Sequence, residues 1–148
     1  MVCEYLKKQD YANIKSFSSG NECIKTVIAG EKPDIVIQDY YLEDSTGIDV
    51  LQAVKKHYKN SEFIFLTAND DMEVAINSIK YGAFDYIIKD NDVAFKKLVD
   101  KINKVSKLIL LRRNNKVSKL AMILVLLVLS IIIISGLLLY AFGIIHTD

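Results

Sequence analysis

The chain has 148 residues, of which 51% are apolar and 25% are charged, and its formal net charge is +1. All but one of the 37 charged side chains lie at or before Lys119, which excludes a uniform soluble globule and a disordered chain. Cys3 and Cys23 are too few for a disulfide framework, so we expect reduced thiols, although the sequence leaves a single bridge open.

The first elements follow from hydropathy and turn residues. Residues 13–17 alternate polar and apolar side chains, which predicts a half-buried strand. Residues 18–21 break this strand and can cap a helix over 22–29, which ends at Gly30. The β-branched run Ile35, Val36 and Ile37 is typical of a strand buried on both faces.

The next segments continue the alternation of predicted strands and helices. Strands are predicted over 63–66 and 85–89, and helices over 48–58, 71–81 and 95–111. The side chains predicted to face inward from these helices are Ile48, Val50, Leu51, Val54, Val74, Ala75, Ile79, Phe95, Leu98, Val99, Ile102 and Val105. This order predicts an α/β fold, in which a parallel sheet carries helices on both faces.

Polar side chains stand where three of the predicted strands end. These are the carboxylate of Asp39, the hydroxyl of Thr67 and the ammonium of Lys89. Ligands of such sheets bind beyond the carboxyl ends of the strands. A carboxylate can attack phosphorus, and a hydroxyl and an ammonium can hold phosphoryl oxygens. The set therefore predicts a phosphoryl site.

The last third of the chain has a different composition. Residues 1–100 have a net charge of −5, whereas residues 101–119 carry seven basic side chains and no acid. Residues 120–145 carry no charge, and such a helix would be about 39 Å long, enough to cross a bilayer. Because the basic residues flank this span on one side only, residues 1–119 are predicted to be cytoplasmic and residues 146–148 external. The basic run, which lacks interleaved aromatic residues, is predicted to contact lipid headgroups rather than nucleic acid.

Four stretches resemble the receiver domain of bacterial two-component response regulators: 33–39, 47–51, 65–68 and 81–89. The last is the most specific, because Gly82, Ala83, Asp85, Tyr86 and Lys89 stand at the family spacing. The resemblance covers about residues 1–110. It implies a flavodoxin-like (CheY-like) doubly wound sheet with strand order 2-1-3-4-5.

The resemblance also implies a role for each site residue. Asp39 would accept the phosphoryl group, Thr67 would be the switch hydroxyl, Lys89 would pair with the phosphate, and Tyr86 would be the switch aromatic. Asp39 and the backbone carbonyl of Tyr41 would bind Mg²⁺.

Two departures from the family pattern affect these expectations. Asp90 follows Lys89 where the family usually has Pro. Residues 1–8 match the end of the family's first helix, so its first strand and magnesium-binding acidic pair are expected before Met1. Glu4 and Asp10 cannot replace that pair, because they fall on the helix and the following loop. Magnesium binding is therefore expected to be weak.

Other site types fit less well. Haloacid-dehalogenase-type phosphatases need a second Asp two residues after the nucleophile, where this chain has Tyr41. His57 could be considered a phosphorelay histidine, but it lies on the polar end of a predicted helix. The sequence has no Cys/His metal spacing and no glycine-rich phosphate loop.

The sequence thus predicts a receiver-like domain over 1–111, a basic linker over 112–119 and a transmembrane helix over 120–145, N-terminally truncated and held at the bacterial inner membrane. It would take phosphate from a histidine kinase or phosphotransfer protein and would not be an enzyme. The alternative is a pseudoreceiver that binds a partner without phosphorylation. The apolar run 108–111 has no predicted cover, so pairing with a second copy or an interfacial position remain open.

Overall fold

The computed structural model describes residues 2–68, 70–90 and 92–145. In chain order the elements are α1 (Val2–Lys8), α2 (Gly20–Ile28), β1 (Ile35–Gln38), α3 (Gly47–His57), β2 (Glu62–Thr67), α4 (Met72–Lys80), β3 (Asp85–Ile88) and α5 (Asp92–Ile145). The chain divides into two compact units, Met1–Lys107 and Leu108–Asp148, and the first contains the sheet.

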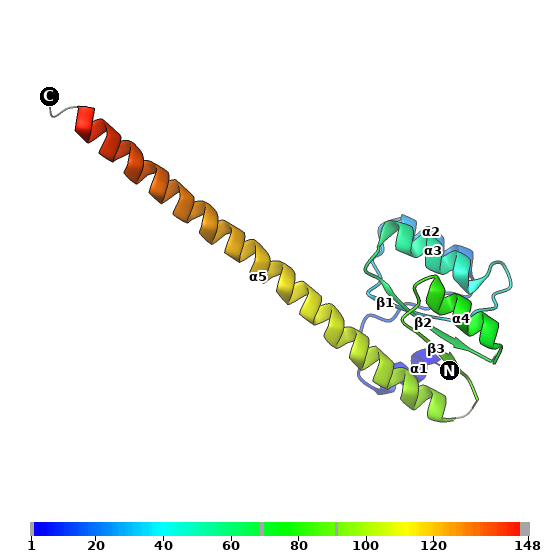
Figure 1. The fold of residues 1–148 in the computed structure, drawn as a ribbon. Helices are drawn as coiled ribbons and strands as arrows, with labels where there is room; N and C mark the ends of the chain where they lie inside the picture. Colours follow the sequence, from blue (N-terminus) through cyan, green and yellow to red (C-terminus); the bar gives the residue numbers. More distant parts are fainter. Residues whose placement is uncertain (1, 69, 91, 146–148) are drawn as a thin grey trace. The chain divides into compact units, whose positions relative to one another are not determined.

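The sheet of the described residues has three parallel strands in the order β1-β2-β3. Helices α2 and α3 cover one face, and α1 and the beginning of α5 cover the other (Figure 1). All six residues of β2 are buried, as its continuous apolar run predicts for a central strand. The parallel α/β architecture predicted from the sequence is therefore confirmed.

The core forms on both faces of β2. Phe63 and Phe65 are fully buried in a cluster with Leu51 and Val54 of α3. Side chains alternate along a strand, so Ile64 and Leu66 point to the opposite face. On that face the buried side chains of α5 are Ala94, Leu98, Ile102 and Val105.

Residues 13–17 are not a strand in the structure, so that prediction is wrong. A strand needs a hydrogen-bonding neighbour, and no described strand lies beside this stretch. The described residues therefore form three of the five strands that the family resemblance implies. The four residues of β1 are half-buried rather than buried on both faces, because β1 is an edge strand.

The inward face of α4 also differs from the prediction. Val74 and Ser78 are buried, whereas Ile79 is 49% exposed. The hydroxyl of Ser78 donates a 2.8 Å hydrogen bond to the carbonyl of Val74, so its burial leaves no polar group unsatisfied. Hydropathy alone predicts that such a serine faces solvent. The predicted buried face of α4 therefore includes Ile79 instead of Ser78.

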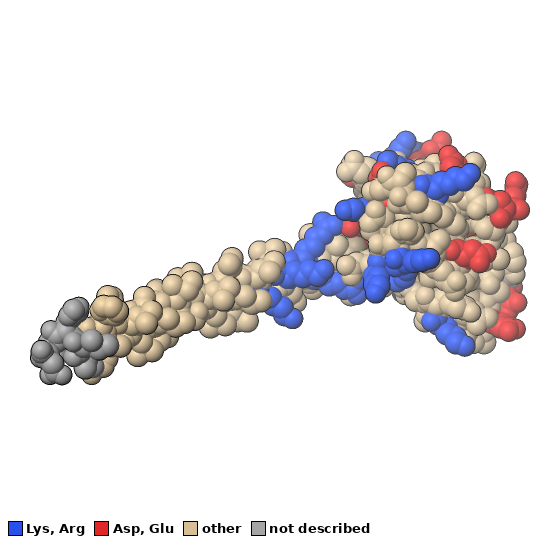
Figure 2. Space-filling model, turned by 90° about the horizontal axis from the view of Figure 1, so that it is seen from above, with Lys and Arg blue, Asp and Glu red and all other residues tan. Residues whose placement is uncertain are grey.

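The second unit is helical throughout its described residues, and α5 continues without a break through Asn114 and Asn115. Helix α5 is the one described helix long and apolar enough to cross a membrane, and none of its most apolar window is buried. Lys and Arg side chains gather on it ahead of the uncharged stretch (Figure 2). Ser130 and Ser135 donate hydrogen bonds to carbonyls of the same helix, at 2.7 and 2.9 Å.

Candidate phosphoryl site

The predicted site residues meet at the carboxyl edge of the sheet. Asp39 directly follows β1, Thr67 is the last residue of β2, and Lys89 directly follows β3. The ammonium Nζ of Lys89 lies 2.8 Å from Oδ2 of Asp39. The hydroxyl of Thr67 donates to the same carboxylate. Three consecutive strand ends therefore bring a carboxylate, a hydroxyl and an ammonium into one cluster.

Thr67 and Lys89 are fixed to different degrees. Thr67 is 1% exposed, and its carbonyl accepts a 2.7 Å hydrogen bond from the backbone N–H of Lys89. That bond ties the end of β2 to the end of β3. The side chains of Lys89 and Asp39 are 34% and 33% exposed, so a small solute can reach their charged ends.

The ionisation of Asp39 results from opposing effects. Burial acts to raise the pKa of this carboxyl group. Hydrogen bonds from Lys89 and Thr67, the charge of Lys89 and the backbone N–H of Tyr41 together outweigh burial and lower the pKa below its ordinary value of 3.8. Asp39 is therefore an ionised carboxylate near neutral pH, as a nucleophile toward phosphorus must be.

The loop after Asp39 returns to the sheet at Gly47, whose N–H donates a 2.7 Å hydrogen bond to the carbonyl of Tyr40. A Cβ at Gly47 would lie 2.7 Å from the carbonyl oxygen of Asp39 and closer still to the ring of Phe65. Thr46 caps α3 and forms a reciprocal capping box with Asp49. The T-x-x-D spacing of Thr46 and Asp49 in the sequence signals this box and hence the start of α3.

Asp44 joins this loop to the start of α2. Its carboxylate accepts 3.0 Å hydrogen bonds from the backbone N–H groups of Gly20 and Asn21. The bond from Asn21 is the largest cause that lowers the pKa of Asp44, to about 2. These partners lie more than 20 residues away in the sequence, so no local pattern could have identified them.

Tyr86 lies on β3 and packs against the core cluster shared by α2 and α3. Burial raises the pKa of its phenol, and nearby negative charges, including Asp71 and Asp39, raise it further. Tyr86 thus lies within electrostatic range of Asp39.

The described residues at this site offer few oxygen ligands for a magnesium ion. Asp39 contributes one carboxylate, and its Oδ1 accepts a 3.4 Å hydrogen bond from the backbone N–H of Tyr41. Across the described ranges no group of three or more His, Cys, Asp or Glu side chains could hold a metal ion. Since Mg²⁺ requires octahedral oxygen ligation anchored on carboxylates, this set does not make a magnesium site by itself.

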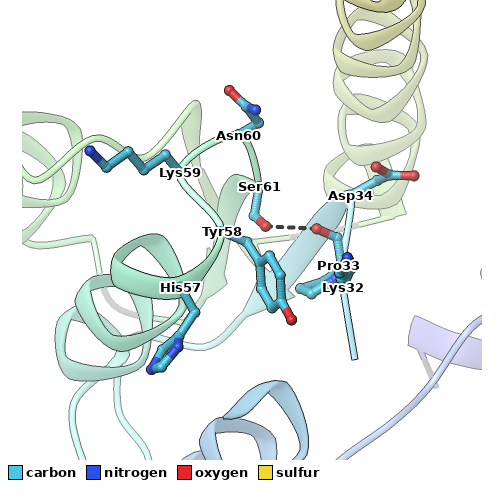
Figure 3. Close-up of a pocket in the computed structure, with 8 residues that line it drawn as sticks. All are labelled: Lys32, Pro33, Asp34, His57, Tyr58, Lys59, Asn60 and Ser61. Carbon is cyan, nitrogen blue, oxygen red and sulfur yellow. Dashed lines mark hydrogen bonds between the residues drawn. The ribbon is translucent and has the colours of Figure 1, made fainter. Parts of the chain in front are cut away.

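A hollow of about 260 Å³ lies at the amino edge of the sheet, opposite the edge that carries Asp39 (Figure 3). The hydroxyl of Ser61 donates a 2.7 Å hydrogen bond to the carbonyl of Pro33 there, and Lys32 lies 5.8 Å from the ring centre of Tyr58. His57 lines this hollow, so it is separated from Asp39 by the length of a strand.

Comparison with known proteins identifies the family. A model of the response regulator receiver domain matches residues 1–103. The regulatory protein LuxO of Vibrio cholerae is 32% identical over 98 residues, which are 65% of this chain and 21% of that protein. The DNA-binding transcriptional regulator NtrC of Proteus hauseri is 32% identical over 79 residues, which are 53% of this chain and 16% of that regulator.

A solved structure supports the same assignment. The signal receiver domain of a putative LuxO repressor protein from Vibrio parahaemolyticus matches with a TM-score of 0.62 and 26% identity. The match covers 74% of this chain and 85% of that domain. This chain spans a small part of the curated regulators and most of a receiver domain. With its CheY-like parallel sheet and a family match over most of its length, the chain belongs to the response regulator receiver domains of two-component signalling.

Proposed function

We propose that this receiver accepts a phosphoryl group on Asp39 from a histidine kinase or phosphotransfer protein, while α5 anchors it in the bacterial inner membrane. The observation that carries the proposal is the convergence of Asp39, Thr67 and Lys89 at one sheet edge, with the carboxylate ionised. The domain would act as a signalling acceptor and not as an enzyme.

The chemistry follows from these groups. A carboxylate oxygen of Asp39 attacks the phosphorus of a phosphohistidine, an O–P bond forms, and the N–P bond breaks. The electron pair of the broken bond remains on the imidazole nitrogen of the donor, which then takes a proton from water. Lys89 and Thr67, which now hold the carboxylate, can hold phosphoryl oxygens as charge-assisted and neutral hydrogen-bond donors.

The test is labelling of the full chain with a small phosphodonor such as acetyl phosphate, in the presence of magnesium. We expect slow labelling, because the described residues supply one carboxylate at the site, and we expect Asp39→Asn to abolish it. Asp10→Asn is the matched control, since Asp10 lies in the loop after α1 at a φ of 60°, which Asn also tolerates.

Two results would change the proposal. Label that survives Asp39→Asn would contradict the acceptor assignment. Efficient labelling of the unmodified chain would show that further carboxylates are not needed. Adding an upstream strand that ends in an acidic pair should raise the labelling rate strongly if the magnesium argument is right.

A pseudoreceiver is the second candidate, and the sparse magnesium donors favour it. In that case the Asp39–Lys89 pair holds the edge of the domain in one shape for a protein partner. Complete absence of label, together with partner binding that is equal for the unmodified chain and Asp39→Asn, would support this alternative.

The proposal that α5 anchors the chain in a membrane rests on the length and composition of this helix and on the basic residues that flank its uncharged stretch on one side.

Self-association remains a proposal for the run 108–111, in which Leu110 and Leu111 are 58% and 55% exposed. Crosslinking of single Cys variants at Leu108 and Leu111 in membranes, with Cys3 and Cys23 replaced, tests it. Lipid-probe labelling without crosslinks would favour an interfacial position.

A further inference from the structure

Helix α5 leaves the first unit at the amino edge of the sheet. It begins at Asp92, just beyond the carboxyl end of β3, and Lys101 forms an ion pair with Asp85, the first residue of β3. The helix therefore runs antiparallel to this strand and has reached the amino edge by Lys101. Lys104 and Lys107 lie beyond that point and are exposed. The segment that follows Lys107 thus joins the first unit at its amino edge.

The other helices also end at this edge. Helices α2, α3 and α4 end just before β1, β2 and β3 begin. Helix α1 runs alongside α5, because Tyr5 lies 5.1 Å from Phe95 between ring centres and the hydroxyl of Tyr11 donates a 2.8 Å hydrogen bond to Asn103. The basic side chains in the last turns of these four helices are Lys7, Lys8, Lys25, Lys55, Lys56, His57 and Lys80. Helix dipoles favour cations at these ends, so part of this charge stabilises the helices.

Two further lysines at the amino edge lie on loops. Lys32 and Lys59 are exposed ahead of β1 and β2, and they line the hollow at this edge (Figure 3). The exposed acids at this edge are fewer, namely Asp10, Glu31, Asp34 and Asp100. Lys15 neutralises Glu31 through an ion pair of 2.5 Å. The amino edge therefore carries an excess of positive charge.

The carboxyl edge has the opposite charge. Its exposed acids are Glu43, Asp44, Asp49, Asp70, Asp71, Glu73 and Asp90. Lys89, which also lies there, is paired with Asp39. The first unit thus has a positive edge and a negative edge at opposite ends of its strands, so an anionic surface attracts the first and repels the second.

We propose that the amino edge docks on anionic lipid headgroups, a proposal that rests on the membrane anchoring of α5. Residues 108–119 cover about 18 Å as a helix, so an inserted α5 keeps Lys107 within about that distance of the hydrocarbon border. Each Lys or Arg close to an anionic leaflet strengthens binding by about fivefold. Docking in this direction leaves the acidic carboxyl edge, with Asp39, directed away from the lipid and open to a phosphodonor.

The test uses the full chain in nanodiscs, with Cys3 and Cys23 replaced and a donor fluorophore on one new Cys. Asn60→Cys puts the fluorophore at the amino edge, and Glu43→Cys puts it at the carboxyl edge. The discs carry an acceptor on their headgroups and contain phosphatidylcholine either alone or mixed with phosphatidylglycerol. Energy transfer from position 60 should rise by about twofold or more with phosphatidylglycerol and should fall back in high salt. Energy transfer from position 43 should not rise.

Charge reversals separate docking from the effect of net charge. Lys32→Glu together with Lys59→Glu should abolish the rise. Lys96→Glu together with Lys97→Glu is the matched control, because it makes the same change in net charge at exposed residues near the start of α5 and should preserve the rise. Equal energy transfer in both kinds of disc, or an equal loss in both double variants, would overturn the docking.

The anchoring is tested separately by washing vesicles that carry the chain with alkaline carbonate. A chain that is retained but shows no rise in energy transfer overturns the docking alone. Release of the chain by the wash overturns the anchoring and the docking with it.

Discussion

The tight approach of Gly47 to Asp39 makes a specific prediction for Gly47→Ala. Gly47 begins α3, and a Cβ there would lie 2.7 Å from the carbonyl oxygen of Asp39 and 3.1 Å from the Cα of Tyr40, in addition to its clash with Phe65. Real Cβ atoms essentially never lie within 3.0 Å of another atom. Two of these neighbours are backbone atoms that cannot rotate away, so the segment carrying Asp39 must shift.

The size of the effect follows from two opposing contributions. Overpacking of this kind costs about 1–3 kcal/mol. Ala forms helix better than Gly by at most about 1 kcal/mol, and less at the first position of a helix. The expected loss in free energy of unfolding is therefore about 1–2 kcal/mol, which corresponds to a fall in Tm of roughly 4–16 °C for a unit of this size. Labelling of Asp39 by acetyl phosphate should fall as well.

The assay is urea unfolding of the full chain in micelles, followed by the near-UV circular dichroism of its tyrosines. Gly20→Ala is the matched control, because a Cβ at the first residue of α2 would meet only side-chain ends, among them methyl groups of Leu42 and Val50 at 2.8 Å. The nearest atom is the hydroxyl oxygen of Ser45, and no backbone atom of the segment that carries Asp39 is among these neighbours, so we expect labelling of Asp39 to be unchanged even though stability falls. If Gly47→Ala unfolds and labels like the unmodified chain, the packing argument is refuted.

Three further predictions concern charge. Lys89→Met should raise the pKa of Asp39, measured by carboxyl NMR titration, while it changes the free energy of unfolding by no more than about 1 kcal/mol, since the pair is a third exposed. Because the pKa of Asp44 is lowered to about 2, its stabilising contribution is complete above the unfolded value of 3.8 and is lost as the pH falls through 2. Asp44→Asn should therefore lower the urea midpoint at pH 6 more than at pH 2. Finally, a reporter fused after Asp148 should be periplasmic and one fused before Leu120 cytoplasmic; the reverse would contradict the topology.

The features that the sequence predicted best are those that depend on a short local segment of the chain alone. The apolar run of β2 and the helical spacing of Val50, Leu51 and Val54 each identify a buried surface without reference to any other segment. The candidate site could be found because parallel strands place their carboxyl ends together, so the residue that ends each strand is enough. The structure brings Asp39, Thr67 and Lys89 together as that rule requires.

Features that depend on distant partners could not be predicted in this way. The alternation over 13–17 is real, but a strand also needs a neighbour, and the pattern carries no information about one. Asp44 reaches the start of α2 through a turn whose geometry no local spacing encodes. Hydropathy favours Ile79 over Ser78 as the inward residue, but Ser78 is buried because its hydroxyl bonds a carbonyl of its own helix.

The three site residues differ in what their interactions contribute, and this bears on how a signal would leave the site. The exposed Asp39–Lys89 pair contributes about 0–1 kcal/mol, so an incoming phosphoryl group can take over the ammonium at little cost to stability. The hydroxyl of Thr67 is buried, and leaving it without an acceptor would cost about 1–3 kcal/mol. Under the proposed function it must therefore follow the new acceptor. Because the carbonyl of Thr67 accepts the N–H of Lys89, any backbone shift of Thr67 that accompanies the rotation of its hydroxyl would reach the ends of both β2 and β3.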